Sequence, residues 1–286
     1  MRRSVIDALQ WLGWNTLPLE KLPVSLAARF AQGLFKFKSV RICGGCGLGV
    51  IDPMPSPRAL DRYYASFFDL GTSLPADPPL NPRGVSQANY LVQTLDFSQI
   101  AQMLEFGAGT ASLTRKLKQY HPGLRATIVE MSLPMLEPLQ RNPLIEAADT
   151  DYAGPPASFD LVVSSHALEH IDDATAVLRK WVSWVRPGGW LMVEVPHANS
   201  DHYSVAHEFV PHSYFFTKSA LQKLVEACGM KTIAIGAGGQ SWGEARSGRP
   251  YPTDPAEWSA TGDAGANLRG LWRKAASGPS AASNGN

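Results

Sequence analysis

An alternation of short apolar runs with amphipathic segments begins near residue 99 and limits the fold of this chain more than any other feature. The runs have the length of buried strands, and the segments between them carry apolar residues at the spacing of one helix face. The expected strands are 103–106, 126–129, 144–147, 161–163 and 190–195, and the expected helices are 111–120, 133–140 and 174–185. This order predicts a doubly wound, mostly parallel α/β sheet. Ligands bind such sheets beyond the carboxyl ends of the strands, so functional residues are expected there.

Residues 1–84 predict a small N-terminal cap with a linker rather than part of this sheet. Apolar residues at helical spacing occupy 5–34, and β-rich segments then flank Cys43-Gly-Gly-Cys46, which is typical of a hairpin with a glycine-rich turn. The helical part is expected to pack on the main domain, with contact to a membrane interface or a partner protein as the alternative. The main domain is expected over 85–240.

After Ile235 the chain has no Val or Ile, and Gly, Pro, Ser and Ala dominate. Such a composition buries little apolar surface, so residues 241–286 are expected to form a loose C-terminal tail. Residues 267–272 are the best candidate for a further strand in this stretch.

The overall charge excludes several classes of partner. Lys and Arg number 26 against 25 Asp and Glu, which leaves no basic excess for nucleic acid or an anionic membrane. Three cysteines cannot form a disulfide framework and suit a reducing compartment. No apolar run reaches the roughly 20 residues of a membrane helix, and polar residues interrupt the first 20, so a cytoplasmic protein is expected.

The sequence Glu-Phe-Gly-Ala-Gly-Thr at 105–110 joins an expected strand to an expected helix. Glycines permit a sharp turn and let the backbone approach a ligand without Cβ atoms in the way. The usual dinucleotide fingerprint has a third glycine where this chain has Ser112, so binding of a pyrophosphate at the helix start is not supported.

Acidic residues follow the next two strands. Glu130 comes 23 residues after Gly107, where a carboxylate can accept both hydroxyls of a ribose. Asp149 follows the third expected strand and can bind an adenine amino group, with Asp151 as a close competitor. Each acid alone is equally well explained as a solvated loop carboxylate or a helix cap, but their positions after successive strands favour a ligand.

Four motifs in this order resemble class I S-adenosylmethionine-dependent methyltransferases. They are Glu-Phe-Gly-Ala-Gly-Thr at 105–110, Ile-Val-Glu at 128–130, Phe-Asp-Leu-Val-Val-Ser-Ser at 159–165 with Leu-Glu-His at 168–170, and Val-Arg-Pro-Gly-Gly at 185–189. The Cys-Gly-Gly-Cys turn and His-Ser-Tyr-Phe-Phe-Thr at 212–217 resemble a subgroup. Its members commonly methylate sugars, surface-glycan precursors or natural-product intermediates, and often carry an N-terminal zinc ribbon.

The resemblance implies S-adenosylmethionine as cofactor and a small-molecule or glycan-type acceptor. The glycine turn would pass the methionine part, Glu105 would help to hold its ammonium group, Glu130 would bind the ribose, and Asp149 the adenine edge. The expected cofactor-binding residues are Glu105, Phe106, Gly107, Ala108, Gly109, Glu130, Met131, Asp149 and Ser165. Members usually end with an antiparallel strand, which the residues beyond Gly236 do not clearly provide, so the sheet edge is expected to be incomplete.

No metal site is expected. Zinc-ribbon relatives have a second cysteine pair upstream, whereas residues 1–42 contain neither Cys nor His, and tetrahedral zinc needs four ligands. Cys43 and Cys46 therefore lack partners unless Cys228 or a second subunit supplies them. A divalent metal held by Asp201, His202, His207 and Glu208 is the alternative, but five-residue spacings do not place these side chains on one helix face.

Six of the seven histidines fall between residues 166 and 212, around the strand ends that form the acceptor side in this class. Imidazole has a pKa near 6.5, which suits removal of a proton from a hydroxyl during methyl transfer. The candidate bases are His207 and His212, in the loop expected over the acceptor, and His166. The alternative is that these side chains cap helices or bind loop carbonyls, which is the preferred interpretation of His170.

The sequence thus predicts methyl transfer to a hydroxyl, or less favourably to carbon or nitrogen, of a small-molecule or glycan-type acceptor. A non-catalytic scaffold built on the cofactor fold is the second hypothesis, motivated by the incomplete cysteine set and the expected loose tail. A nicotinamide-dependent oxidoreductase shares the ribose acid and the glycine turn but lacks the third glycine. The oligomeric state is open.

Overall fold

The structure is a computed structural model that describes residues 39–52, 54–57, 60, 78–199, 202 and 212–276. The helices expected within 5–34 and the candidate base His207 lie outside the described residues. None of the helices in the described ranges is long and apolar enough to cross a bilayer.

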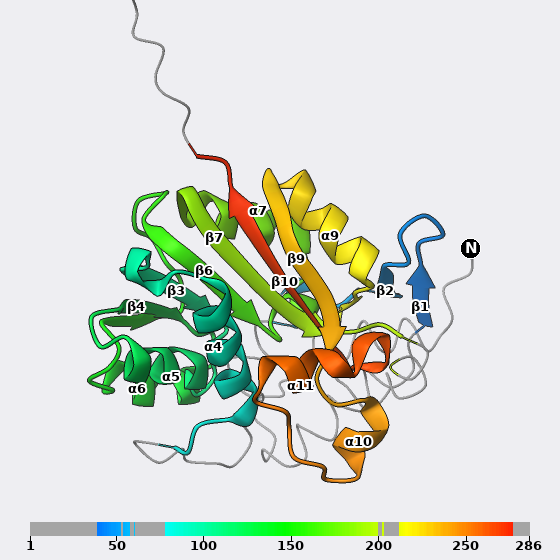
Figure 1. The fold of residues 1–286 in the computed structure, drawn as a ribbon. Helices are drawn as coiled ribbons and strands as arrows, with labels where there is room; N and C mark the ends of the chain where they lie inside the picture. The colour runs from blue at the N-terminus through cyan, green and yellow to red at the C-terminus, as the bar shows by residue number, and fades with distance from the viewer. Residues whose placement is uncertain are drawn as a thin grey trace, which may run out of the picture.

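A seven-stranded sheet with the order β5-β4-β3-β6-β7-β10-β9 forms the centre of the molecule (Figure 1). The five strands from β5 to β7 are parallel, and β10 runs antiparallel to both of its neighbours. The strands are β3 (Gln102–Phe106), β4 (Arg125–Val129), β5 (Ala147–Asp149), β6 (Phe159–Ser165), β7 (Val185–Pro196), β9 (Met230–Gly238) and β10 (Asn267–Lys274). The predicted doubly wound, mostly parallel sheet is confirmed.

Helices cover both faces of the sheet, as the alternation of strands and helices predicts. On one face lie α4 (Pro82–Thr94), α5 (Ser112–Tyr120) and α6 (Leu133–Gln140), and on the other α7 (Ala174–Trp184) and α9 (Lys218–Ala227) (Figure 1). Neighbouring strand residues face opposite layers: Met103 packs with α4 and α5, while Leu104 packs with α7. Burial on both sides explains why these strands are continuously apolar in sequence.

Helix α7 begins and ends close to its predicted limits. Asp173 caps it by accepting a hydrogen bond from the Ala176 N–H (2.9 Å). The helix ends at Trp184, and the segment Pro187-Gly188-Gly189 lies inside β7 instead of stopping the helix. The chain leaves the helix at Val185, which already pairs with Phe159 of β6.

Residues 241–276 include two helices, a 3₁₀ turn and a strand, so the expectation of a loose tail from residue 241 is wrong for these residues. They form α10 (Trp242–Arg246), α11 (Pro255–Ala260), a 3₁₀ turn η5 (Gly262–Ala264) and β10. The candidate strand 267–272 is confirmed, and it lies between β7 and β9 rather than leaving the sheet incomplete. The charged residue Arg269 makes the strand pattern weak in the sequence. Its charge is paired in the fold with Glu194, which lies directly opposite on β7.

The predicted hairpin with the cysteine turn is present. Strands β1 (Ser39–Ile42) and β2 (Gly49–Asp52) pair antiparallel, and β8 (Tyr214–Phe215) adds a third strand. This pairing ties the hairpin to the chain that enters α9. Within the described ranges, neither Cys43 nor Cys46 belongs to a group of three side chains close enough to share a metal ion.

Candidate functional site

A cavity of about 470 Å³ opens beyond the carboxyl ends of β3, β4 and β6, where a doubly wound sheet binds its ligands. Its volume falls within the range of about 300–1,000 Å³ typical of small-molecule sites. Eight of the nine predicted cofactor-binding residues line it: Glu105, Phe106, Gly107, Ala108, Gly109, Glu130, Met131 and Ser165. These residues thus lie together around one cavity, and their contacts with the cofactor stay predictions.

The glycine turn after β3 forms the floor of the cavity. Gly107 has a φ of +67° and donates its N–H to the Val129 carbonyl (2.8 Å). A Cβ atom at this position would lie 2.7 Å from the Cβ of Ala167, so only glycine fits. Ala111, which leads into α5, also has a positive φ of 50° and occupies a conformation that side chains disfavour.

Glu130 stands at the end of β4 with its side chain almost completely buried. One carboxylate oxygen accepts the Gly109 N–H (2.7 Å) and the other accepts the Ser132 N–H (2.8 Å). Burial raises the pKa of Glu130, while these backbone donors act in the opposite direction. Each oxygen keeps a second lone pair, so the fixed carboxylate can accept two further hydrogen bonds.

Glu105 lies at the end of β3 and lines the same cavity. It accepts hydrogen bonds from the Thr114 hydroxyl (2.5 Å) and the Thr114 N–H (3.3 Å). Burial raises the pKa of Glu105 to about 7, against the effect of these donors. A carboxylate in this state is stabilised by a cationic ligand group, because an opposite charge favours the ionised form.

Asp149 is the one predicted cofactor residue outside the cavity lining. Its carboxylate accepts the Thr150 N–H (2.7 Å), and its backbone carbonyl accepts the Glu130 N–H (2.9 Å). In the structure it therefore positions Glu130 through the backbone, and its contact with adenine stays a prediction.

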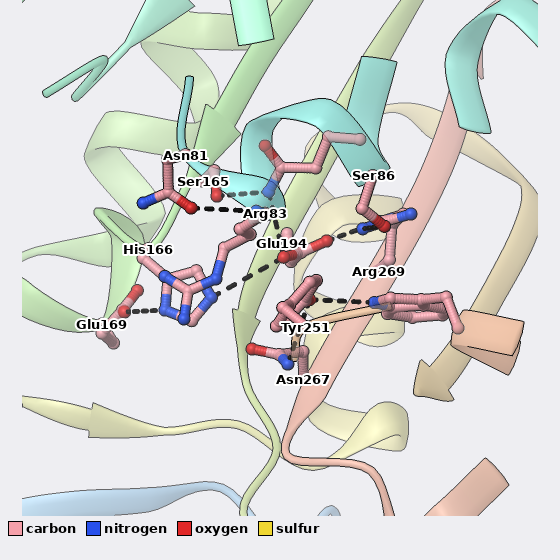
Figure 2. Close-up of polar contacts among 12 residues, drawn as sticks. Asn81, Arg83, Ser86, Ser165, His166, Glu169, Glu194, Tyr251, Asn267 and Arg269 are labelled. Carbon is pink, nitrogen blue, oxygen red and sulfur yellow. Dashed lines mark hydrogen bonds and ion pairs between the residues drawn. The ribbon is translucent and has the colours of Figure 1, made fainter. Parts of the chain in front are cut away.

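The opposite wall is built from α4 and from the end of β6 with the segment after it. Ser165 and His166 in this wall were named from the sequence, whereas the contribution of α4 was not. Gln87 donates to the Ser165 hydroxyl (2.6 Å) and to Glu194 (2.9 Å). Glu194 also accepts a hydrogen bond from Arg269 (2.5 Å) (Figure 2). The Arg269 guanidinium lies 4.2 Å from the centre of the Trp258 ring. This buried network fixes Gln87 at the cavity edge.

His166 is the one predicted base that lines the cavity among the described residues. Its backbone has a φ of 52°, and its ring lies between two buried carboxylates (Figure 2). Nδ1 is 3.4 Å from Glu169 and Nε2 is 3.7 Å from Glu194. Burial and the Arg83 charge lower the pKa of His166, but the two carboxylates outweigh them and raise it overall.

His212 does not line the cavity. It is buried behind His170, with ring centres 4.8 Å apart, and burial holds its pKa well below the ordinary value. Burial likewise lowers the pKa of His202 to about 4. Glu169, between these rings and His166, has a pKa of about 2: burial opposes ionisation, but the neighbouring imidazoles outweigh it.

His170, interpreted from sequence as structural, lines the cavity, as do Asn81 and Arg83. Nothing in the local sequence marks the last two, because α4 reaches the site only through its packing against α5. Gly84 allows this packing, since a Cβ atom there would lie 2.7 Å from the Leu113 nitrogen.

The fold and this cavity agree with the class that the sequence motifs predict, a methyltransferase domain. A family model described as "Methyltransferase domain" matches residues 76–235, more than half of the chain, and the chain belongs to this family. Among solved structures, a methyltransferase from Thermotoga maritima titled as a possible histamine N-methyltransferase gives a TM-score of 0.52 at 17% identity, covering 68% of this chain and 90% of that one. A methyltransferase from Mesorhizobium loti gives 0.51 at 17%, covering 68% and 100%.

Two curated relatives match in sequence. Trans-aconitate 2-methyltransferase of Deinococcus radiodurans is 35% identical over 106 residues, which are 36% of this chain and 41% of the relative. Ubiquinone biosynthesis O-methyltransferase of Xanthomonas euvesicatoria is 26% identical over 124 residues, 40% of this chain and 51% of the relative. The matched region thus spans about half, or less, of the length of these relatives.

Proposed function

We propose that this protein transfers a methyl group from S-adenosylmethionine to a hydroxyl of a small, polar acceptor. Sugar-type molecules belong to this class of acceptor. The observation that carries the proposal is the Glu130 carboxylate, fixed by the Gly109 and Ser132 N–H groups beside a turn that only glycine can form. This arrangement offers two parallel acceptors to a ribose diol and leaves room for a ligand along the turn.

The residues of the cavity fit S-adenosylmethionine. Glu130 would bind the ribose hydroxyls, Glu105 would face the ammonium group, and Met131 would supply an apolar contact to the base. When bound, the cofactor supplies a methyl group on a positively charged sulfur. The chain has to hold the acceptor oxygen in line with the S–CH₃ bond at about 3–3.5 Å and to keep water away.

On the acceptor side, we assign His166 as the proton acceptor. As the O–CH₃ bond forms and the S–CH₃ bond breaks, the hydroxyl proton passes to the imidazole, leaving S-adenosylhomocysteine and the methyl ether. Glu169 and Glu194 stabilise the resulting imidazolium. Arg83, whose Nε has no hydrogen-bond partner among the residues that the structure describes, and Gln87 supply polar groups to orient the acceptor. The name of one relative specifies methylation of oxygen, which supports this choice of atom.

The test is calorimetric titration with S-adenosylhomocysteine, followed by transfer of a labelled methyl group to a panel of hydroxylated metabolites. Gly107→Arg is expected to abolish binding, whereas the matched control Gly123→Arg, at a turn with open space around it, is expected to bind normally. His166→Asn is expected to lower turnover without changing the affinity for S-adenosylhomocysteine. Absence of binding to the wild type would refute the proposal, and binding without any transfer would favour the scaffold hypothesis.

A further inference from the structure

A buried carboxylate beside the cavity lacks the hydrogen bonds that such a group requires. Glu169 lies in the 3₁₀ turn η3 (Leu168–His170) after β6, and it is 1% exposed. Within the part of the chain that the structure describes, neither carboxylate oxygen accepts a hydrogen bond, and the nearest imidazole nitrogens lie 3.4 Å (His166) and 3.6 Å (His170) away. A buried charge without donors is costly, so a positively charged partner is expected at this position.

Two imidazoles are directed at the same place. Ligand atoms of Glu169, His170 and His212 all lie within 4.8 Å of one another. The His170 and His212 rings meet edge to face, with 71° between their planes, rather than stacking. The Ser213 N–H donates to the Glu169 carbonyl (2.7 Å), so the segment that carries His212 is tied to the turn that carries the other two residues.

The separations agree better with ligands around a shared ion than with direct hydrogen bonds. A charge-assisted N–H···O⁻ bond would bring its atoms to about 2.7–2.9 Å. Ligands at about 2.0–2.2 Å from a tetrahedral metal ion lie about 3.3–3.5 Å apart. Among the proposed ligands, the Glu169 carboxylate is 3.6 Å from His170 Nε2, close to this spacing, and all three ligand atoms lie within 4.8 Å of one another, so a bound ion would draw the His212 side chain inward.

We propose that Glu169, His170 and His212 bind a divalent transition-metal ion, with zinc as the best fit to two imidazoles and one carboxylate in a buried setting. His166 lies beside this site and can support it from the cavity side. Three protein ligands leave a fourth position for water or a substrate oxygen, as in catalytic zinc sites.

The site has a direct use in the reaction, and this part of the inference rests on the proposed function. His170 and His166 line the cavity, so an ion held next to them would meet the acceptor hydroxyl. A bound metal lowers the pKa of a coordinated hydroxyl and fixes its orientation. The metal would thereby complement proton removal by His166, without any change in the role of the cofactor residues.

The experiment uses the full chain, freed of metal with a chelator and titrated with Zn²⁺ by calorimetry and with Co²⁺ by visible absorption. The wild type is expected to bind one equivalent of either ion and to show the absorption of four-coordinate Co²⁺. Glu169→Gln and His212→Asn are expected to weaken binding by more than about 100-fold, since even supporting residues of metal sites contribute about 10–100-fold. The control is His121→Gln, which removes an imidazole that stacks on Phe97 away from the cluster, and it is expected to bind as the wild type does.

X-ray absorption of the zinc-loaded wild type provides a measurement that does not depend on the folding of any variant. A shell of nitrogen and oxygen ligands with two imidazoles would support the site. Sulfur ligands would assign the metal to Cys43 and Cys46 and would overturn the proposed metal site. A wild-type protein that binds S-adenosylhomocysteine but no metal would also overturn the proposed metal site. Metal binding without S-adenosylhomocysteine binding would instead refute the proposed function and leave the metal site standing.

Discussion

Replacement of Glu130 by glutamine tests the ribose contact with a minimal change of shape. In the wild type, each carboxylate oxygen accepts one backbone N–H, from Gly109 at 2.7 Å and from Ser132 at 2.8 Å. A glutamine has one oxygen and one NH₂ group, so in either orientation the NH₂ meets a backbone N–H that it cannot bind. The variant therefore loses one backbone bond and one of the two acceptors offered to a ribose diol.

The magnitude follows from the loss of one hydrogen bond to a charged acceptor. Such a bond contributes about 1.5–3 kcal/mol, so the Kd for S-adenosylhomocysteine is expected to rise about 10- to 150-fold. The lost backbone bond lowers the free energy of unfolding by about 1–3 kcal/mol as well.

Isothermal titration of Glu130→Gln with S-adenosylhomocysteine provides the measurement. Glu137→Gln on α6 is the matched control, because Glu137 is exposed and its carboxylate pairs with Arg141 at the surface. The Kd of this variant is expected to stay at the wild-type value. A folded Glu130→Gln protein whose Kd lies within about threefold of the wild type would show that this carboxylate does not bind the ribose.

Three further predictions concern the stability of the site. Because burial raises the pKa of Glu105 to about 7 from its ordinary 4.5, the folded chain holds this proton more tightly. The resulting stabilisation is complete below about pH 4.5 and is lost as the pH rises through about 7, a change in the free energy of unfolding of up to about 3 kcal/mol. Glu105→Gln should remove this pH dependence in urea unfolding measured at several pH values. A pH profile of the variant that equals that of the wild type would contradict the prediction. Arg269→Met leaves buried Glu194 without its counter-charge and is expected to lower the free energy of unfolding by about 3–5 kcal/mol, with much of it recovered in the double variant with Glu194→Gln; a nearly neutral single variant would refute this. Ala111→Gly relieves a positive φ but removes a buried methyl group, so thermal unfolding should show a free energy of unfolding within about 0.5 kcal/mol of the wild-type value. The control Ala176→Gly in α7 should lower the free energy of unfolding by about 0.5–1 kcal/mol. Equal losses in the two variants would argue against strain at Ala111.

The strands that could be predicted are those whose pattern is local. In β3, β4, β6 and β7 both faces are covered by helices, so their residues form apolar runs that are visible in the sequence. Strand β10 lacks this signal because it carries the buried charge of Arg269, which pairs with Glu194 on β7 and lies over the Trp258 ring of α11. These partners meet only in the folded sheet, which is why composition suggested a loose tail.

The residues of the site also differ in how far the local sequence could predict them. The glycine turn and Glu130 follow directly after strands, so their place at the cavity could be inferred from their position in the sequence. The positions of Gln87 and of the group Glu169, His170 and His212 could not be inferred in this way. They depend on how α4 and the segment before β8 pack against the end of β6. Histidines in the right region were recognised, but only the fold separates His166, in the cavity wall, from His212 behind it.

A crystal structure of the protein with S-adenosylhomocysteine tests the central claim most directly. The account predicts that both ribose hydroxyls lie within hydrogen-bond distance of the Glu130 carboxylate and that the homocysteine part runs along Gly107 and Gly109. A ligand bound elsewhere, or a ribose that does not touch Glu130, would contradict it.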